Sequence, residues 1–279
     1  MSKRMPIFFH IPKNAGTYVI TANQALLEEN CKPQLLVKNF LVDIPNSTLL
    51  RVFCAINNET LFQIQSRMTY KIDKLNAVID FDEFLEFVRA KSMQILSMVI
   101  EPGYFWGCSK FSTNLLPCFA AAFKICVMHD MNYICYTILR PIAERCKSIY
   151  SYLRSEASSH EPNHQCINSG SLEEHVNSEE FETNWICRSI LGCESINESR
   201  FADVCGLLSK FHVYNILQAD QCINDIFRLC FEANNIQLDK QQLNKNKNKQ
   251  NSQIINNNLI DAINQKNAWD YRLYSTFLM

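Results

Sequence analysis

A short apolar strand that runs directly into a turn and a helix opens this chain, and the same arrangement returns from residue 133. The first unit reads as a strand over 6–11 and a helix over 17–29, with apolar residues along one helix face. The second reads as a strand over 133–139 and a helix over 142–154. Repeated strand–turn–helix units predict an α/β fold with a central parallel sheet flanked by helices, and with ligands at the carboxyl ends of the strands.

The rest of the sequence extends this pattern. Further strands are predicted over 35–42, 49–57, 98–100 and 211–217, and further helices over 81–96, 171–177, 183–191, 199–210, 219–233 and 259–278. Residues 155–171 and the Asn/Lys/Gln-rich stretch 244–258 read as exposed loops. Since no internal repeat and no linker interrupts the pattern, we interpret 1–279 as a single domain that contains the 244–258 loop.

Composition excludes several classes of partner. With Lys+Arg at 27 and Asp+Glu at 28, the formal net charge of -1 gives no basic field that would favour nucleic acid. The 13 cysteines include no C-x-x-C pair, and no apolar run is long enough for a signal peptide or a membrane span. We therefore expect a soluble cytoplasmic protein with reduced thiols. His160, His164 and Cys166 lie close together but within a polar loop, so no metal is expected there.

The most informative segment is Phe8-Phe9-His10-Ile11-Pro12-Lys13-Asn14-Ala15-Gly16-Thr17. A strand that enters a helix through a tight turn directs several backbone N–H groups at one point, where a phosphate or sulfate is favoured. Lys13 adds a positive charge and Thr17 adds a hydroxyl donor. The segment is not a Walker A loop, which needs the pattern G-x-x-x-x-G-K-[ST]. Its local pattern fits an ordinary strand–helix turn with a surface lysine equally well.

The second informative segment is Leu139-Arg140-Pro141-Ile142-Ala143-Glu144-Arg145-Cys146-Lys147-Ser148-Ile149-Tyr150. Arg140 follows a strand directly, and its guanidinium can hold a phosphate through two hydrogen bonds. Arg145 and Ser148 are three residues apart on the predicted helix and therefore share a face. Taken alone, the segment also fits a solvated helix with a structural arginine.

Together, the two segments resemble the nucleotide-binding motifs of sulfotransferases that use 3′-phosphoadenosine 5′-phosphosulfate (PAPS). The most similar branch modifies carbohydrates and includes the heparan-sulfate 2-O- and 6-O-sulfotransferases and their bacterial relatives. The family's first motif, roughly F-x-H-I-P-K-T-G-G-T-S, is matched at Phe8, His10 to Lys13, Gly16 and Thr17. Its second, roughly L-R-D-P-x-E-R-x-x-S-x-Y, is matched at Leu139, Arg140, Glu144, Arg145, Ser148 and Tyr150.

Weaker similarities follow in the family's order along most of the chain. Residues 184–192 resemble an N-x-x-x-R-x-x-L-G segment, and residues 267–274 resemble a terminal N-x-x-D-x-x-L-Y helix. Residues 211–218 lie where the family has a final strand ending in G-L-T-E, with Asn215 and Gln218 in place of the glycine and the glutamate. The Lys-rich residues 244–249 lie where relatives often place a loop over the nucleotide.

The resemblance implies a P-loop-like sulfotransferase fold, PAPS as co-substrate, no metal, and a hydroxyl acceptor that is most simply a carbohydrate. By matching position, the 5′-phosphosulfate would be held by Lys13, Gly16 and Thr17, with backbone N–H groups from Asn14 and Ala15. The 3′-phosphate would be held by Arg140 and Ser148. Lys13 would also have a catalytic role, since it would neutralise charge on the departing phosphate.

The chain departs from the family pattern at three points. Pro141-Ile142 replaces the Asp-Pro that follows the arginine, and Ala15 replaces a glycine, which we expect to be tolerated if Ala15 has a negative φ. The third departure concerns the general base that accepts the acceptor's proton. Where relatives carry G-H-x-x-[FY]-G, this chain has residues 101–107, and the expected histidine falls on Gly103.

Glu101 is the candidate for this general base, since a glutamate serves in some other sulfotransferases. An exposed turn residue without a catalytic role is the alternative for Glu101. His129 is a poorer candidate because it precedes a strand and is expected at the opposite end of the sheet. The neighbouring aromatic residues 104–106 could stack on a sugar or pack in the core.

Two other functions compete with a sulfotransferase. A catalytically degenerate relative would keep the PAPS fold and bind only a nucleotide or a glycan. A P-loop kinase would also handle phosphate, but the missing Walker A glycines and the segment from Arg140 to Ser148 count against it.

Overall fold

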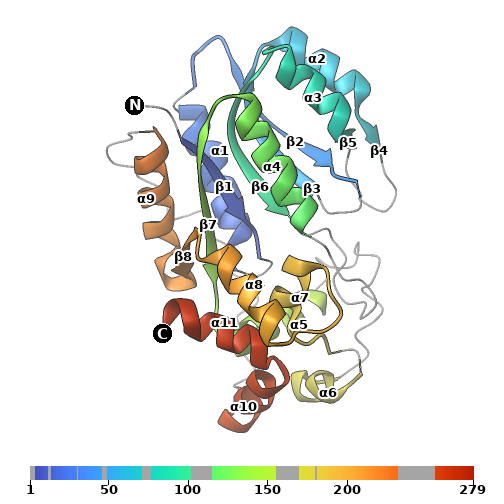
Figure 1. Cartoon of the computed structure of the whole chain (residues 1–279), viewed down its shortest axis with the longest axis vertical. Helices are drawn as coiled ribbons and strands as arrows, with labels where there is room; N and C mark the ends of the chain where they lie inside the picture. The colour runs from blue at the N-terminus through green and yellow to red at the C-terminus, as the bar shows by residue number, and fades with distance from the viewer. Residues whose placement is uncertain are drawn as a thin grey trace.

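The computed structural model describes residues 4–11, 14–29, 31–45, 49–70, 77–101, 115–154, 170–179, 181–231 and 255–279. Within these ranges the chain forms a mixed sheet of eight strands in the order β4-β5-β2-β3-β6-β1-β7-β8 (Figure 1). The strands are β1 (Arg4–Phe9), β2 (Leu36–Asp43), β3 (Leu49–Ile56), β4 (Thr69–Tyr70), β5 (Ala77–Asp80), β6 (Gln94–Glu101), β7 (Asn132–Leu139) and β8 (Phe211–Asn215). The α/β class predicted from the sequence is confirmed.

The sheet is parallel in only part of its width. Strands β6, β1, β7 and β8 are parallel neighbours, as expected. The prediction of a parallel sheet is wrong for β3, which is antiparallel to both β2 and β6. The short connection between β2 and β3 accounts for their antiparallel pairing, because a parallel crossover needs about a dozen residues or more.

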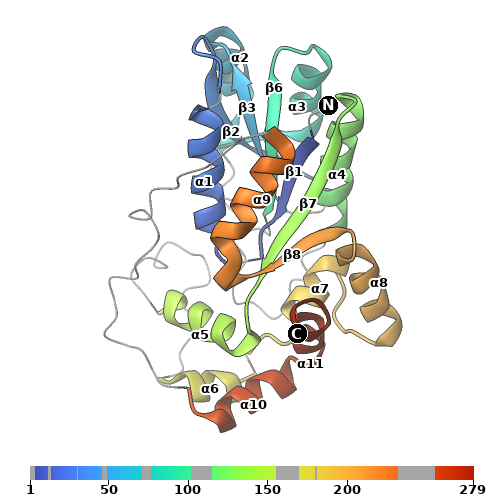
Figure 2. The same ribbon diagram turned by 90° about the vertical axis from the view of Figure 1, so that its left-hand side faces the viewer.

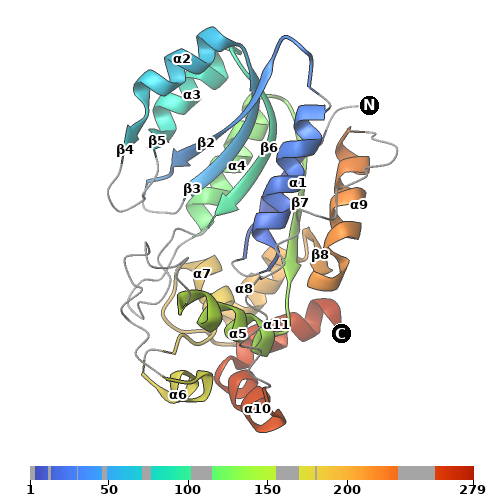
Figure 3. The same cartoon turned by 180° about the vertical axis from the view of Figure 1, so that it is seen from behind.

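Helices cover both faces of the sheet. They are α1 (Gly16–Glu29), α2 (Asn58–Arg67), α3 (Phe81–Arg89), α4 (Leu116–Met128), α5 (Ile142–Leu153), α6 (Leu172–Asn177), α7 (Trp185–Leu191), α8 (Glu198–Leu208), α9 (Ala219–Phe231), α10 (Asn257–Lys266) and α11 (Ala268–Leu278), with a 3-10 turn, η4, over Ile216–Gln218. Helices α1 and α9 lie on one face, which is turned toward the viewer in Figure 3. Helix α4 lies on the other face, in front of the sheet in Figure 1.

Strand β1 is buried on both sides, as the central strand of such a sheet must be. Ile7 and Phe9 point into the core under α3 and α4, whereas Phe8 points into the core under α1 and α9. All three side chains are fully inaccessible to solvent. This burial explains why β1 reads as a continuous apolar run rather than an alternating one.

Helices α5, α6, α7, α10 and α11 gather beyond the carboxyl ends of the parallel strands (Figure 1). Helix α5 leaves β7 and packs against α10 and α11, while α7 packs against α8 and α11 (Figure 2). The predicted helices over 171–177, 183–191, 199–210 and 219–233 therefore correspond to α6, α7, α8 and α9. The helix predicted over 259–278 is divided at Asn267 into α10 and α11.

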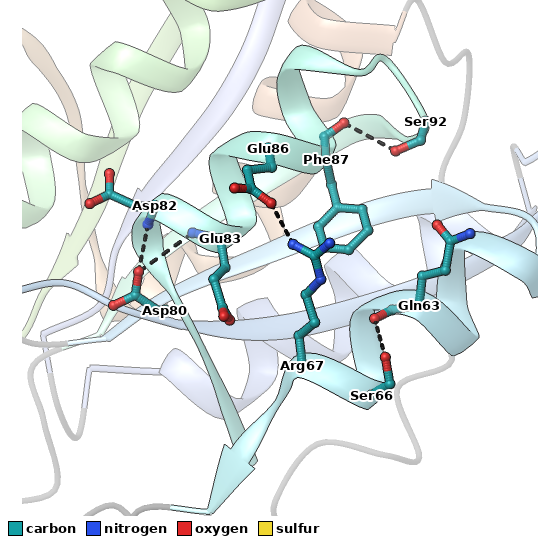
Figure 4. Close-up of polar contacts among 9 residues, drawn as sticks. All are labelled: Gln63, Ser66, Arg67, Asp80, Asp82, Glu83, Glu86, Phe87 and Ser92. Atoms are coloured by element: carbon teal, nitrogen blue, oxygen red, sulfur yellow. Dashed lines mark hydrogen bonds and ion pairs between the residues drawn. The ribbon is translucent and has the colours of Figure 1, made fainter.

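The α2–α3 region shows one difference from the sequence-based expectation. A helix was expected over 81–96, but α3 ends at Arg89 and β6 begins at Gln94. Lys91 takes a left-handed conformation (φ 51) and the Ser92 N–H donates to the Phe87 carbonyl, which ends the helix. Figure 4 shows this end of α3 beside Arg67 of α2, whose guanidinium pairs with Glu86 and lies over the Phe87 ring.

No helix in the described parts of the chain is both long enough and apolar enough to cross a membrane.

Candidate functional site

The turns that follow β1 and β7 lie side by side at the carboxyl edge of the sheet. The two strands are parallel neighbours, with Phe9 in register with Thr137. The Thr137 hydroxyl donates to the Phe9 carbonyl at 2.9 Å, and the Asn14 side-chain amide donates to the Ile138 carbonyl at 2.9 Å. Asn14 is fully buried, so its hydrogen bond fastens the first turn to the end of β7. The two sequence motifs therefore meet at one edge.

The first turn closes tightly over His10. A Cβ atom added to Gly16 would lie 1.7 Å from the His10 Nε2 atom, so the imidazole occupies the space that any other residue at 16 would need. The His10 ring is also stacked on Phe8, with ring centroids 6.0 Å apart. Gly16 is therefore favoured by a side-chain contact that the sequence motif alone does not reveal.

Ala15 has a left-handed backbone, with φ 61, so the condition under which alanine was expected to be tolerated at this position is not met. The cause lies in the turn itself, which must reverse direction between the end of β1 and the first residue of α1. A left-handed conformation costs a non-glycine residue about 1–2 kcal/mol. The glycine that the resembled family carries here would avoid that cost.

The start of α1 is suited to an anion. The first N–H groups of a helix have no acceptor within the helix, and they form the positive end of its dipole. The first turn of α1 contains no acidic residue, and Thr17 is exposed there. Tyr18 points away toward α9, where its hydroxyl donates to Asp220, and burial together with this carboxylate raises the pKa of Tyr18 above its usual range.

Arg140 lies directly after β7, at the same edge. Its Nε atom is 3.4 Å from the Glu144 carboxylate on the first turn of α5, and 26% of the Arg140 side chain is exposed. Ser148 lies two turns further along α5 and is half-buried. A cation at a strand end and a hydroxyl on the following helix are groups that can together hold a phosphate.

Arg145, by contrast, belongs to the protein interior. Its side chain is 4% exposed, and its guanidinium lies 4.8 Å from the centroid of the Trp185 ring on α7. Burial lowers the pKa of Arg145, while the charges of Cys146, Asp270 and Glu182 raise it. The structure thus uses Arg145 to join α5 to α7.

The segments around 184 and 267, which the resemblance singled out, hold the C-terminal helices together. Asp270 accepts hydrogen bonds from the backbone N–H groups of Ile186 and Cys187, both at 2.9 Å. Asn184, in a left-handed conformation, accepts from the Trp269 N–H at 2.9 Å and donates its own N–H to Asn267. These reciprocal bonds fix the start of α7 to the start of α11, so their role is structural.

The residues that depart from the family at the end of β8 also form a local structure. Asn215 accepts from the Leu217 N–H, and Gln218 accepts from the Asn215 N–H, which together cap η4. The Asn215 amide also donates to the Tyr274 hydroxyl at 2.7 Å, which ties β8 to α11. Asn215 and Gln218 therefore cap η4, and Asn215 also anchors the last helix.

Glu182, which the sequence reasoning missed, has an unusual protonation equilibrium. Burial raises its pKa to about 7, even though the positive charges of Arg145 and Arg188 oppose the shift. A carboxyl group with such a pKa can exchange a proton near neutral pH. Only its partly buried position beside Arg145 and Arg188, and nothing in the sequence around it, distinguishes Glu182 from other glutamates.

Several predicted site residues lie outside the described residues: Lys13 with Pro12, residues 102–107, and His160, His164 and Cys166. The backbone of Glu101 ends β6, in register with Leu49, at the same edge as Arg140. His129 follows α4 and precedes β7, so it lies at the opposite edge, as expected. Among the residues that the structure describes, no three His, Cys, Asp or Glu side chains form a group that could hold a metal.

No protein-family model matches this chain, and no curated protein matches it.

Proposed function

We propose that this protein is a PAPS-dependent sulfotransferase that transfers a sulfuryl group to a hydroxyl group, with a carbohydrate as the acceptor. The observation that carries this proposal is the meeting of the two motif turns on neighbouring parallel strands, joined by the hydrogen bond from Asn14 to the Ile138 carbonyl. PAPS has two separated anionic ends, and this edge of the sheet offers two separated places for them. The sequence resemblance adds the assignment of each end.

The 5′-phosphosulfate would lie at the start of α1. Backbone N–H groups of Ala15, Gly16 and Thr17 would donate to its oxygens, the Thr17 hydroxyl would add a further donor, and Lys13 would add a positive charge. The Asn14 N–H, which the resemblance also assigned to this ligand, donates instead to the Ile11 carbonyl at 3.1 Å. The absence of acidic residues from the first turn of α1 supports this assignment, since a carboxylate there would repel the ligand.

The 3′-phosphate would lie between Arg140 and Ser148. Arg140 is partly exposed, and its ion pair with the exposed Glu144 is a weak surface pair that a dianionic phosphate would outcompete. The Arg140 guanidinium would then bind the phosphate in a bidentate manner. Arg145 would contribute no contact to the nucleotide, because it is buried against Trp185.

In the reaction, the acceptor oxygen would attack the sulfur while the bond from sulfur to the bridging phosphate oxygen breaks. The acceptor's proton would pass to a general base, for which Glu101 at the end of β6 is the candidate. The electron pair of the broken bond would remain on the phosphate, and the ammonium of Lys13 would neutralise the charge that develops there. Adenosine 3′,5′-bisphosphate and a sulfated acceptor would be released.

The first experiment is thermal denaturation with adenosine 3′,5′-bisphosphate, and with ATP as the comparison ligand. At 100 times Kd a ligand stabilises the folded state by about 2.7 kcal/mol, which corresponds to roughly 4–5 °C for a chain of this size. We expect this shift with the bisphosphate and a much smaller one with ATP. In the control variant Lys210→Ala the shift with the bisphosphate should be unchanged, since Lys210 is an exposed cation at the opposite edge of the sheet, before β8.

Equal stabilisation by ATP would refute the assignment of a 3′-phosphate site and would favour a general phosphate-binding enzyme. If the bisphosphate binds but no hydroxylated acceptor supports its release from PAPS, the protein is a binding relative that has lost its general base.

A further inference from the structure

A cavity of about 120 Å³ lies at the amino-terminal edge of the sheet, opposite the candidate nucleotide site. It lies between the starts of β1 and β6, at Arg4 and Gln94, and the carboxyl ends of α1 and α9. These two helices contact each other along the same face of the sheet (Figure 2). None of the residues that line this cavity belongs to the candidate nucleotide site.

The cavity has an apolar floor. Leu26 and Leu27 at the end of α1 and Phe227 of α9 line it, with exposed fractions of 3%, 3% and 1%. An engineered apolar cavity of about 150 Å³ binds benzene, so a space of this size accepts one ring or a branched group of similar volume.

The mouth of the cavity carries positive charge. The two charged residues that line it, Arg4 and Lys32, are both cations, and no carboxylate is among its lining residues. Neither cation forms an ion pair with any residue that the structure describes. The carboxyl ends of α1 and α9 add partial negative charges of roughly half a unit each, which two full positive charges exceed.

We propose that this cavity is a binding site for a small amphiphilic carboxylate, with a ring-sized apolar group on the floor and the carboxylate between Arg4 and Lys32. The apolar group would gain from leaving water. The guanidinium of Arg4 matches the two oxygens of a carboxylate. Because both cations are exposed, they direct the ligand and select for its charge, while the apolar floor supplies most of the affinity.

Phenylacetate is the probe, and Cys31 gives a readout that does not depend on enzymatic activity. The Cys31 thiol is partly exposed and lines the cavity, whereas Cys193 and Cys205 are partly exposed elsewhere. Phenylacetate should slow the alkylation of Cys31 by iodoacetamide, followed by peptide mass spectrometry, and leave Cys193 and Cys205 unaffected. For a ligand of this size the protection should saturate with a midpoint of about 1 mM.

Three comparisons test the chemistry of the site. Phenylacetamide, which lacks the charge, should protect Cys31 more weakly. Arg4→Gln and Lys32→Gln should each raise the midpoint about two- to fivefold, as expected for exposed charges. Leu35→Trp, which places a large ring at a half-buried lining position, should abolish protection.

Two results would overturn the proposal: no saturable protection of Cys31 in the wild-type protein, or equal protection by phenylacetate and phenylacetamide. If Leu35→Trp does not fold, the exposed Arg4→Gln and Lys32→Gln variants still decide the question. An unchanged midpoint in both of them would equally overturn the role of the cations.

Discussion

The contact between His10 and Gly16 gives the sharpest prediction, because it joins two residues of the first motif through space. In Gly16→Ala, the new Cβ would lie 1.7 Å from the His10 Nε2 atom, about half of an ordinary nonbonded separation. The imidazole must therefore move away from its position on Phe8. Gly16 does not have a positive φ, so the backbone itself tolerates alanine and the whole effect comes from His10.

Overpacking of this kind costs about 1–3 kcal/mol. We expect Gly16→Ala to lower the free energy of unfolding by that amount and to lower Tm by about 2–10 °C. In a His10→Ala background the space is vacant, and the same substitution should cost little. The difference is a coupling energy of about 1–3 kcal/mol, obtained from urea denaturation of the two single variants and the double variant.

Gly206→Ala is the matched control for this cycle. Gly206 lies within α8, and a Cβ there would meet nothing within 4 Å. Alanine should therefore stabilise the protein by about 0.5–1 kcal/mol, which is the helix preference for alanine over glycine. If the effects of Gly16→Ala and His10→Ala add to within about 0.5 kcal/mol, the residues are not coupled and the close contact is refuted.

Four further predictions follow from the site and its surroundings. Arg140→Ala should weaken the binding of adenosine 3′,5′-bisphosphate by about 10- to 150-fold, measured by calorimetry, and unchanged affinity would make Arg140 structural. Glu101→Gln should lower sulfuryl transfer by about 10²- to 10⁴-fold with little change in nucleotide affinity, whereas wild-type turnover would remove Glu101 from the mechanism. Asp270→Asn should lower the free energy of unfolding by about 1–3 kcal/mol, because it weakens the acceptor for two buried N–H groups; a change within experimental error in urea denaturation would contradict the structural role of Asp270. Burial raises the pKa of Glu182 from 4.5 to about 7, so the ionisation of Glu182 lowers the stability of the wild type as pH rises through this interval. The free energy of unfolding of Glu182→Gln should therefore rise relative to that of the wild type between pH 5 and pH 8. Parallel pH profiles of the two proteins would contradict this.

The sequence predicts best where one physical signal dominates. Strands β1 and β7 are largely apolar because both of their faces are buried, and the turns after them carry the residues predicted to bind an anion. The amphipathic α9 is similarly clear, since its apolar residues face one side of the sheet. In these elements local pattern and tertiary environment agree, and the predicted positions are confirmed.

Helix α4 shows where such reasoning fails. It carries apolar residues on its exposed face as well as on its buried one, with Leu116 43% and Val127 78% exposed, so it presents no amphipathic stripe and was not predicted as a helix. The end of α3 was misplaced for a different reason. Its left-handed terminator is Lys91, and lysine gives no signal of the kind that glycine gives at a helix end.

The candidate site could be located from the sequence only in part. The motifs predicted two anion-binding turns, and the order of the strands alone brings those turns together, since β1 and β7 are distant in the sequence but adjacent in the sheet. The contact of His10 with Gly16 and the left-handed Ala15 depend on atomic packing within the turn. Packing of this kind leaves no trace in residue spacing.

The same packing separates two kinds of residue that the resemblance had grouped together. Asn184, Asn267 and Asp270 are satisfied by one another and by the helix ends that they cap, so the fold alone accounts for these residue types. Arg140 is partly exposed and Thr17 is exposed at the carboxyl edge of the sheet, where a ligand can reach both side chains. A protein that kept only the fold would need the first group, whereas one that binds an anion also needs the second. Substitution of Arg140 therefore distinguishes function from architecture more directly than any change among the buried residues.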